Sequence, residues 1–266
     1  MRIGALDMLA NVSPAQIWPL AAPLLSDSSR GVRIRAAALL AAVPTASQPP
    51  ADRELFERAA AEFVAAQRLN ADRPEARSTL GNFLARPGLL ADAEVEYKEA
   101  LRLSPQYGPA AINLADLYRQ LGQDGDGETV LRATIASSPQ DAGLHYALGL
   151  ALTRLKRREE TLGELRRAAE LDPDRARYAY VYAVGLHLAG QVDEAMAVLK
   201  ASVARHPTDR DTLLHSSAIA AMPGILGPRS ITPSSSPAGR RASLTSPIDA
   251  ALFLPHSRPH QRNGGS

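Results

Sequence analysis

The chain has 266 residues, of which 45% are hydrophobic and 5% aromatic, and none is a cysteine. Most of the hydrophobic residues are alanine and leucine, which suit close-packed helices, and the aromatic residues that strands favour are scarce. We therefore expect helices and no sheet. The absence of cysteine excludes disulfides, thiolate metal ligands, a cysteine nucleophile and covalent haem attachment.

The formal net charge of +2 is unevenly distributed. From His215 onward there are five arginines and one acid, Asp249, whereas the preceding residues hold 25 basic and 27 acidic side chains. The part that we expect to fold is therefore close to neutral and offers no basic stripe for a phosphate backbone. We predict no nucleic-acid partner.

Residues 1–43 contain a short helical pattern that occurs twice. The stretch MRIGALDMLA at the start aligns with VRIRAAALLA (32–41), which pairs Arg2 with Arg33. A Val-Arg start followed by alanine and leucine at helical spacing resembles the second helix of short HEAT-like repeats. Because Met1 stands where such a repeat has valine, we expect the first repeat to be truncated at its N-terminus.

The N-terminal sequence makes a poor signal peptide, because Asp7 interrupts its short apolar run. The longest uncharged apolar stretch, residues 36–43, is far shorter than the ~20 residues of a membrane span. We expect no membrane insertion. The expected location is cytoplasmic for the chain as written, and periplasmic if it derives from a longer exported protein.

A linker and a single helix follow. The prolines of residues 44–51 exclude a helix there, so this segment is predicted to be a linker. Residues 52–73 then form a helix whose apolar residues recur at helical spacing: Leu55, Ala59, Phe63 and Ala66. We expect this helix to cap the array of repeats that comes next.

Prolines then recur at a constant spacing of 34 residues, at Pro105, Pro139, Pro173 and Pro207. A period of this length indicates a helical repeat architecture. Each proline ends the second helix of a unit, because the residue before proline is pushed out of the helical region. The predicted units are residues 74–107, 108–141, 142–175 and 176–209.

The first unit carries Leu80-Gly81, Ala93, Tyr97, Ala100 and Pro105. This pattern of Leu-Gly, alanine, aromatic, alanine and proline resembles the tetratricopeptide repeat, and the other units match it in register. The resemblance implies an all-α fold, a right-handed α-solenoid of helix hairpins.

Small residues should mark where the two helices of each hairpin cross, at Gly81, Ala115, Gly149 and Ala183. We expect small residues of the second helix to face them, at Ala93, Thr161 and Ala195. The second unit is the weakest, because Gly125 and Gly127 occupy the start of its second helix and each helix-interior glycine costs ~1 kcal/mol. Local opening should begin there.

The pattern ends soon after the fourth unit. Residues 210–222 begin like another first helix, but Pro223-Gly224 stops it. Residues 223–266 are rich in serine, proline and arginine without helical period, and are predicted to be disordered. Two origins stay open with equal weight, a genuine tail and a shifted reading frame.

The sequence contains no arrangement of residues that indicates catalysis. It has no phosphate-binding glycine loop, no paired metal ligands on one helix and no nucleophile with a base at a recognisable spacing. We predict a protein that is not an enzyme and that has no cofactor and no metal site.

The first helices of the units should line a concave face, on which residues 34 apart stack in columns. Tyr146 and Tyr180, with Leu150 and Val184, then predict an apolar and aromatic groove with partly exposed rings. The alternative is that these residues pack in the core. Asp116 belongs to the column of Leu150 and Val184, and Asn82 begins it.

Asn82 and Asn113 are spaced like the two asparagines of the carboxylate clamp of some tetratricopeptide co-chaperones. The cations of that clamp are replaced by Ser78, Gly143 and Ala147, so we do not expect a chaperone tail as the ligand. The resemblance implies that the two asparagines hydrogen-bond the backbone of an extended peptide.

About half of the chain resembles bacterial tetratricopeptide repeat proteins. With the HEAT-like piece in front, it looks like the C-terminal part of larger bacterial proteins, some of which carry a multihaem cytochrome c domain. The first functional hypothesis is a non-catalytic scaffold that binds a peptide or partner protein. The alternative is a detached regulatory or assembly segment of an exported multihaem redox enzyme.

Overall fold

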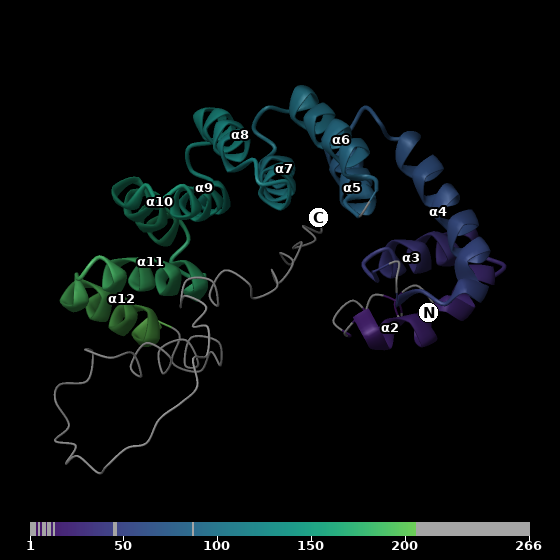
Figure 1. The fold of residues 1–266 in the computed structure, drawn as a ribbon, viewed down its shortest axis with the longest axis horizontal. Coiled ribbons are helices and arrows are strands. Elements are labelled where there is room, and N and C mark those ends of the chain that lie inside the picture. The colour runs from purple at the N-terminus through teal and green to yellow at the C-terminus, as the bar shows by residue number, and fades with distance from the viewer. Residues whose placement is uncertain are drawn as a thin grey trace, which may run out of the picture. The chain divides into compact units, whose positions relative to one another are not determined.

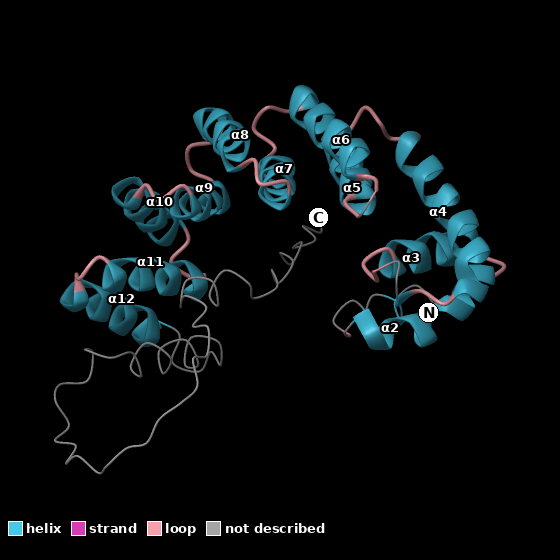
Figure 2. Ribbon diagram, viewed as in Figure 1, coloured by secondary structure: helices cyan, strands magenta, loops and turns pink. Residues whose placement is uncertain are grey.

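The computed structural model describes residues 4, 6, 9, 12, 14–44, 47–86 and 88–205. Within these ranges every regular element is a helix and none is a strand (Figure 2). The chain divides into two compact units, which are larger than the single repeats described above. From here on, the first unit means Met1–Ala147 and the second unit means Leu148–Ser266. The expected first helix 210–222 and the tail 223–266 lie outside the described residues.

The first unit begins with α2 (Pro14–Ala21), the 3₁₀ helix η2 (Ala22–Ser26) and α3 (Arg30–Leu40). A 3₁₀ turn, η4 (Pro50–Asp52), lies at the end of the predicted linker and leads into α4 (Arg53–Arg68), inside the range predicted for the capping helix. Trp18 and Phe56 contact each other with ring centroids 5.8 Å apart. The indole Nε1 of Trp18 donates a hydrogen bond of 2.8 Å to Asp52, which fixes the start of α4 against α2.

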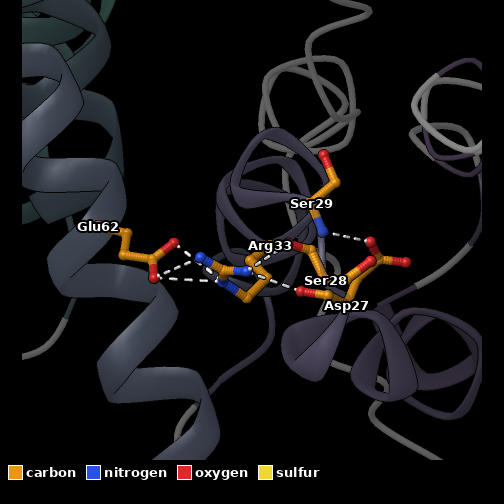
Figure 3. Close-up of polar contacts among 5 residues, drawn as sticks. All are labelled: Asp27, Ser28, Ser29, Arg33 and Glu62. Carbon is orange, nitrogen blue, oxygen red and sulfur yellow. Dashed lines mark hydrogen bonds and ion pairs between the residues drawn. The ribbon is translucent and has the colours of Figure 1, made fainter.

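Arg33 joins α3 to α4 and to the turn before α3 (Figure 3). Its Nη2 and Nε lie 2.8 and 3.1 Å from the two carboxylate oxygens of Glu62, a bidentate pair. Its Nη1 donates to the backbone carbonyls of Asp27 at 2.7 Å and Ser28 at 3.2 Å. The Asp27 carboxylate in turn accepts a hydrogen bond from the backbone N–H of Ser29 at 2.8 Å. One side chain thus sets the position of α3, its preceding turn and α4.

The repeats follow as helix hairpins (Figure 1). In the first unit these are α5 (Pro74–Leu84) with α6 (Leu90–Leu103), and α7 (Gly108–Gln120) with α8 (Asp124–Ser137). The helix α9 (Ala142–Arg154) runs from the first unit into the second, which continues with α10 (Arg158–Leu171), α11 (Ala176–Leu188) and α12 (Val192–Arg205).

The helix ends agree with the expected effect of the prolines. The helices α6, α8 and α10 each end two residues before Pro105, Pro139 or Pro173. Despite its two glycines, α8 forms over the full length that the pattern predicts.

The crossings of the hairpins differ in detail from the expected pairing. A Cβ placed on Gly81 would lie 2.6 Å from the ring of Tyr97, and one on Gly149 would lie 2.8 Å from Leu165. These neighbours come one helical turn after Ala93 and Thr161, the residues that we expected to face the glycines. Side chains in a helix lean toward its N-terminus, so a residue one turn further on covers the crossing point.

In the second repeat two small residues lie together, because a Cβ on Gly127 would lie 3.5 Å from the Cα of Ala115. Here the helices meet through two small residues, whereas Tyr97 and Leu165 cover the glycines of the first and third repeats. In the first and third repeats one large side chain thus packs against a glycine, and in the second repeat two small residues meet.

Candidate functional site

Two of the expected binding residues, Asn82 and Asn113, lie together in the first unit. They come from α5 and α7, and the phenol of Tyr97 reaches them from α6. The Oδ1 of Asn82 accepts two hydrogen bonds of 2.8 Å, one from the hydroxyl of Tyr97 and one from Nδ2 of Asn113. Three consecutive helices therefore converge on one amide oxygen.

Tyr97 fixes the orientation of the Asn82 amide. The tyrosine is 2% exposed, and burial, with a contribution from the charge of Asp116, raises its pKa well above the usual range of a phenol. The hydroxyl therefore stays protonated and donates to Oδ1. Since Asn82 itself is exposed, its Nδ2 is the end of the amide that is left for solvent or a ligand.

The arrangement leaves one donor and one acceptor without a partner among the described residues, Nδ2 of Asn82 and Oδ1 of Asn113. A donor beside an acceptor matches the C=O and N–H of an extended peptide backbone. The site therefore has the chemistry of main-chain recognition.

Asp116 lies one helical turn after Asn113 and is partly exposed. Its carboxylate accepts hydrogen bonds from two side chains of its own helix, Arg119 at 2.7 Å and Gln120 at 3.2 Å. The adjacent guanidinium offsets much of its negative charge, so Asp116 offers a polar edge to the asparagine pair more than a strong anionic site.

The aromatic and apolar residues of the expected groove are less accessible. Tyr146 is 7% exposed, so the expectation of a partly exposed ring is wrong for this residue. In the second unit Val184 is 2% exposed, whereas Leu150 and Tyr180 keep part of their surface. Burial raises the pKa of Tyr180 above the usual range of a phenol. Of the apolar set, Leu150 and Tyr180 are the residues that a partner can touch.

A further surface of the first unit was not found from the sequence. It is a groove of about 530 Å³ on α4 and the end of α5, and its walls include Ala61, Val64, Phe83 and Arg86. The sequence carries only a partial signal of it: Ala60 and Val64 of α4 stand where α6 has the charged residues Glu94 and Lys98.

The described part of the chain contains no group of three or more histidine, aspartate or glutamate side chains that could hold a metal ion. Among the described helices, none combines the length and the apolar character that crossing a bilayer requires.

Comparison with known proteins identifies the repeats. Residues 84–151 and residues 159–210 match two family models that are both described as tetratricopeptide repeat. The chain carries tetratricopeptide repeats. No curated protein matches the chain.

The chain is similar to several solved structures. The thermophilic TPR protein TTC0263 of Thermus thermophilus is 21% identical over 79% of this chain and all of its own length, with a TM-score of 0.51. YrrB, described as a TPR protein with an unusual peptide-binding site, is 19% identical over 77% of this chain and 100% of its own, with a TM-score of 0.45. MamA is 17% identical over 60% of this chain and 96% of its own, with a TM-score of 0.48.

The likeness to TTC0263 concerns the fold, which is the expected all-α solenoid of helix hairpins. Tetratricopeptide repeats are generally non-catalytic modules that bind proteins or peptides, which supports a protein-interaction scaffold. Both family matches lie after α4. The HEAT-like assignment of residues 1–43 and the relation to a multihaem protein therefore stay predictions.

Proposed function

We propose that this protein is a non-catalytic scaffold that holds an extended peptide segment of a partner at the Asn82–Asn113 pair. The observation that carries the proposal is the double hydrogen bond to Oδ1 of Asn82, from Tyr97 and Asn113. It holds one amide donor and one amide acceptor ready, so little side-chain entropy is lost on binding.

The asparagine pair recognises the main chain of the peptide, because its amide donor and amide acceptor can hydrogen-bond the backbone of any residue. Sequence preference then has to come from side chains nearby. Asp116 is such a group in the first unit, and it favours a polar or basic residue of the peptide only weakly, since Arg119 already binds it. Within the second unit, taken by itself, Leu150 and Tyr180 offer partly exposed surface for apolar contacts with a partner.

The test is a peptide selected from a random display library against the wild-type chain and then measured by fluorescence anisotropy. The Asn82→Ala, Asn113→Ala double variant should lose about tenfold or more in affinity, since each lost hydrogen bond contributes on the order of 1 kcal/mol. Tyr97→Phe keeps both asparagines but frees the Asn82 amide to turn, and should weaken binding by a smaller factor.

Asn70→Ala is the matched control. Asn70 is an exposed asparagine just after α4, and its Nδ2 donates a hydrogen bond to the carbonyl of Ala66 in that helix, so its removal should leave the affinity unchanged. A double variant that folds, as judged by circular dichroism, and binds the selected peptides as tightly as the wild type would exclude the asparagine pair as the binding site.

A further inference from the structure

The groove on α4 and α5 combines an apolar floor with charged side chains at its rim. Ala60, Ala61, Val64 and Ala65 form one face of α4, and Phe83 closes the floor from α5. The charged lining residues are Glu57, Arg68 and Arg86. The space of about 530 Å³ is large enough for a few side chains of a partner segment.

Arg86 lies in this groove without an anionic partner. Its guanidinium carbon is 4.7 Å from the ring centroid of Phe83 and 5.4 Å from that of Phe56. Its Nε is buried and has no hydrogen-bond partner, and its side chain forms no ion pair among the described residues. Burial lowers the pKa of Arg86, although the charge of Glu57 opposes this effect. The two rings compensate only part of the lost hydration of the cation.

Two other arginines that connect helices in the described part of this unit each bind a carboxylate. Arg33 binds Glu62, and Arg77 of α5 binds Glu96 of α6 at 2.8 Å. Glu57 is the acidic residue whose charge acts on Arg86. It is exposed at the rim of the groove, however, and forms no ion pair with Arg86. A carboxylate brought by another molecule would complete the pair that none of the described residues makes.

The corresponding face of α6 is different. Thirty-four residues after Ala60, Val64 and Ala65 stand Glu94, Lys98 and Glu99. There Glu94 binds Lys98 at 2.6 Å and accepts a hydrogen bond from Tyr118 of α7 at 2.8 Å. Long charged side chains thus cover this face on α6, whereas on α4 alanines leave it open to the close approach of another chain.

We propose that this groove is a second docking surface, which binds a segment of a partner protein that carries a carboxylate beside small aliphatic side chains. The aliphatic side chains pack on Ala61, Val64 and Ala65, and the carboxylate binds Arg86, with Arg68 at the rim. The surface is separate from the asparagine pair. Asn82 contacts side chains of α6 and α7, whereas its neighbour Phe83 stacks on Phe63 of α4 with ring centroids 4.3 Å apart.

The probe for the test is a short fluorescein-labelled helical peptide of alanine and leucine with one central glutamate, compared with the same peptide carrying glutamine. Fluorescence anisotropy with the full chain should show binding of the glutamate peptide with a Kd below about 1 mM, and at least tenfold weaker binding of the glutamine peptide. No binding of the glutamate peptide, or equal binding of the two, would overturn the proposal.

Three substitutions locate the site on the chain. Arg86→Gln should weaken the glutamate peptide by about tenfold or more, as should Ala65→Glu, which gives α4 the acid that α6 has at Glu99. Glu57→Gln should tighten binding, because it removes the competing anion from the rim. Since Ala65 and Glu57 are exposed, these two variants test the groove even if Arg86→Gln fails to fold.

Arg102→Gln is the matched control, because Arg102 is the counterpart of Arg68 on α6 and binds Glu99 there. It should bind the peptide like the wild type, and so should the Asn82→Ala, Asn113→Ala variant. Loss in that asparagine variant would assign the peptide to the first site and overturn this proposal. A dimer in sedimentation equilibrium that Ala65→Glu dissociates would assign the groove to a second copy of the chain, which also contradicts a separate partner.

Discussion

Gly149 illustrates how one absent side chain permits a helix crossing. A Cβ at this position would lie 2.8 Å from both Cγ and Cδ2 of Leu165 and 3.4 Å from its backbone N. Gly149→Leu should therefore push α9 and α10 apart and lower the free energy of unfolding by about 1–3 kcal/mol or more. Chemical denaturation followed by circular dichroism measures the change.

Gly163→Ala provides the control in the same hairpin. Gly163 lies in α10, is exposed, and would have no atom within 4 Å of an added Cβ. Alanine there should stabilise the helix by about 0.5–1 kcal/mol. An unchanged stability of Gly149→Leu would show that the two helices do not cross at this glycine.

The sequence predicted which residues lie close together better than it predicted how deeply each residue is buried. The resemblance to the carboxylate clamp singled out Asn82 and Asn113, and the structure brings these two residues together. The period of 34 residues put Tyr146 on the lining face, yet this residue is only 7% exposed. A repeat period gives the direction of a side chain on its helix, but the atoms that cover it depend on contacts that the period does not contain.

At the scale of the helices, Glu94 connects α6 to α7. It forms hydrogen bonds with Lys98 of its own helix and with the hydroxyl of Tyr118 of α7, and these lower its pKa below the usual 4.5. Because the folded pKa is depressed, the stability from this link is complete above the unfolded pKa and is lost as the pH falls through the folded pKa. The melting temperature of the Glu94→Gln variant should therefore fall less between about pH 5 and pH 3 than that of the wild type.

The comparison variant for this pH experiment is Glu99→Gln. Glu99 binds Arg102 at 2.7 Å within α6, so it connects no second helix. Its melting temperature should fall with pH as steeply as that of the wild type. If Glu94→Gln and Glu99→Gln gave the same slope, the contact of Glu94 with Tyr118 would not contribute to stability.

At the scale of elements, the prolines predicted the helix ends, because their effect on the preceding residue is local. The groove beside α4 could not be predicted in the same way. It depends on Arg86, which follows α5, lying over the rings of Phe83 in α5 and Phe56 in α4. The sequence shows only that alanines replace charged residues on α4, which by itself does not distinguish an open face from a covered one.

For the molecule as a whole, stability in a repeat array is close to a sum of the repeats and their interfaces with neighbours. The weakest repeat then determines where the chain opens first. Gly125 and Gly127 make α8 the weakest second helix, since the equivalent positions hold Ala91 and Ala93 in α6. We therefore expect the amide protons of α8 to exchange faster than those of α6 and α10.

The Gly125→Ala, Gly127→Ala double variant should remove this weak point. An added Cβ at Gly125 meets nothing within 4 Å, and one at Gly127 would make ordinary contacts of 3.4 to 3.6 Å with Ala115. The variant should gain about 1–2 kcal/mol, because alanine restricts the unfolded chain and favours the helix. Native-state hydrogen exchange should then show α8 protected to the level of α6, with a higher denaturant midpoint for the whole chain. If α8 of the wild type already exchanged as slowly as α6, its glycines would not be the point at which the array opens.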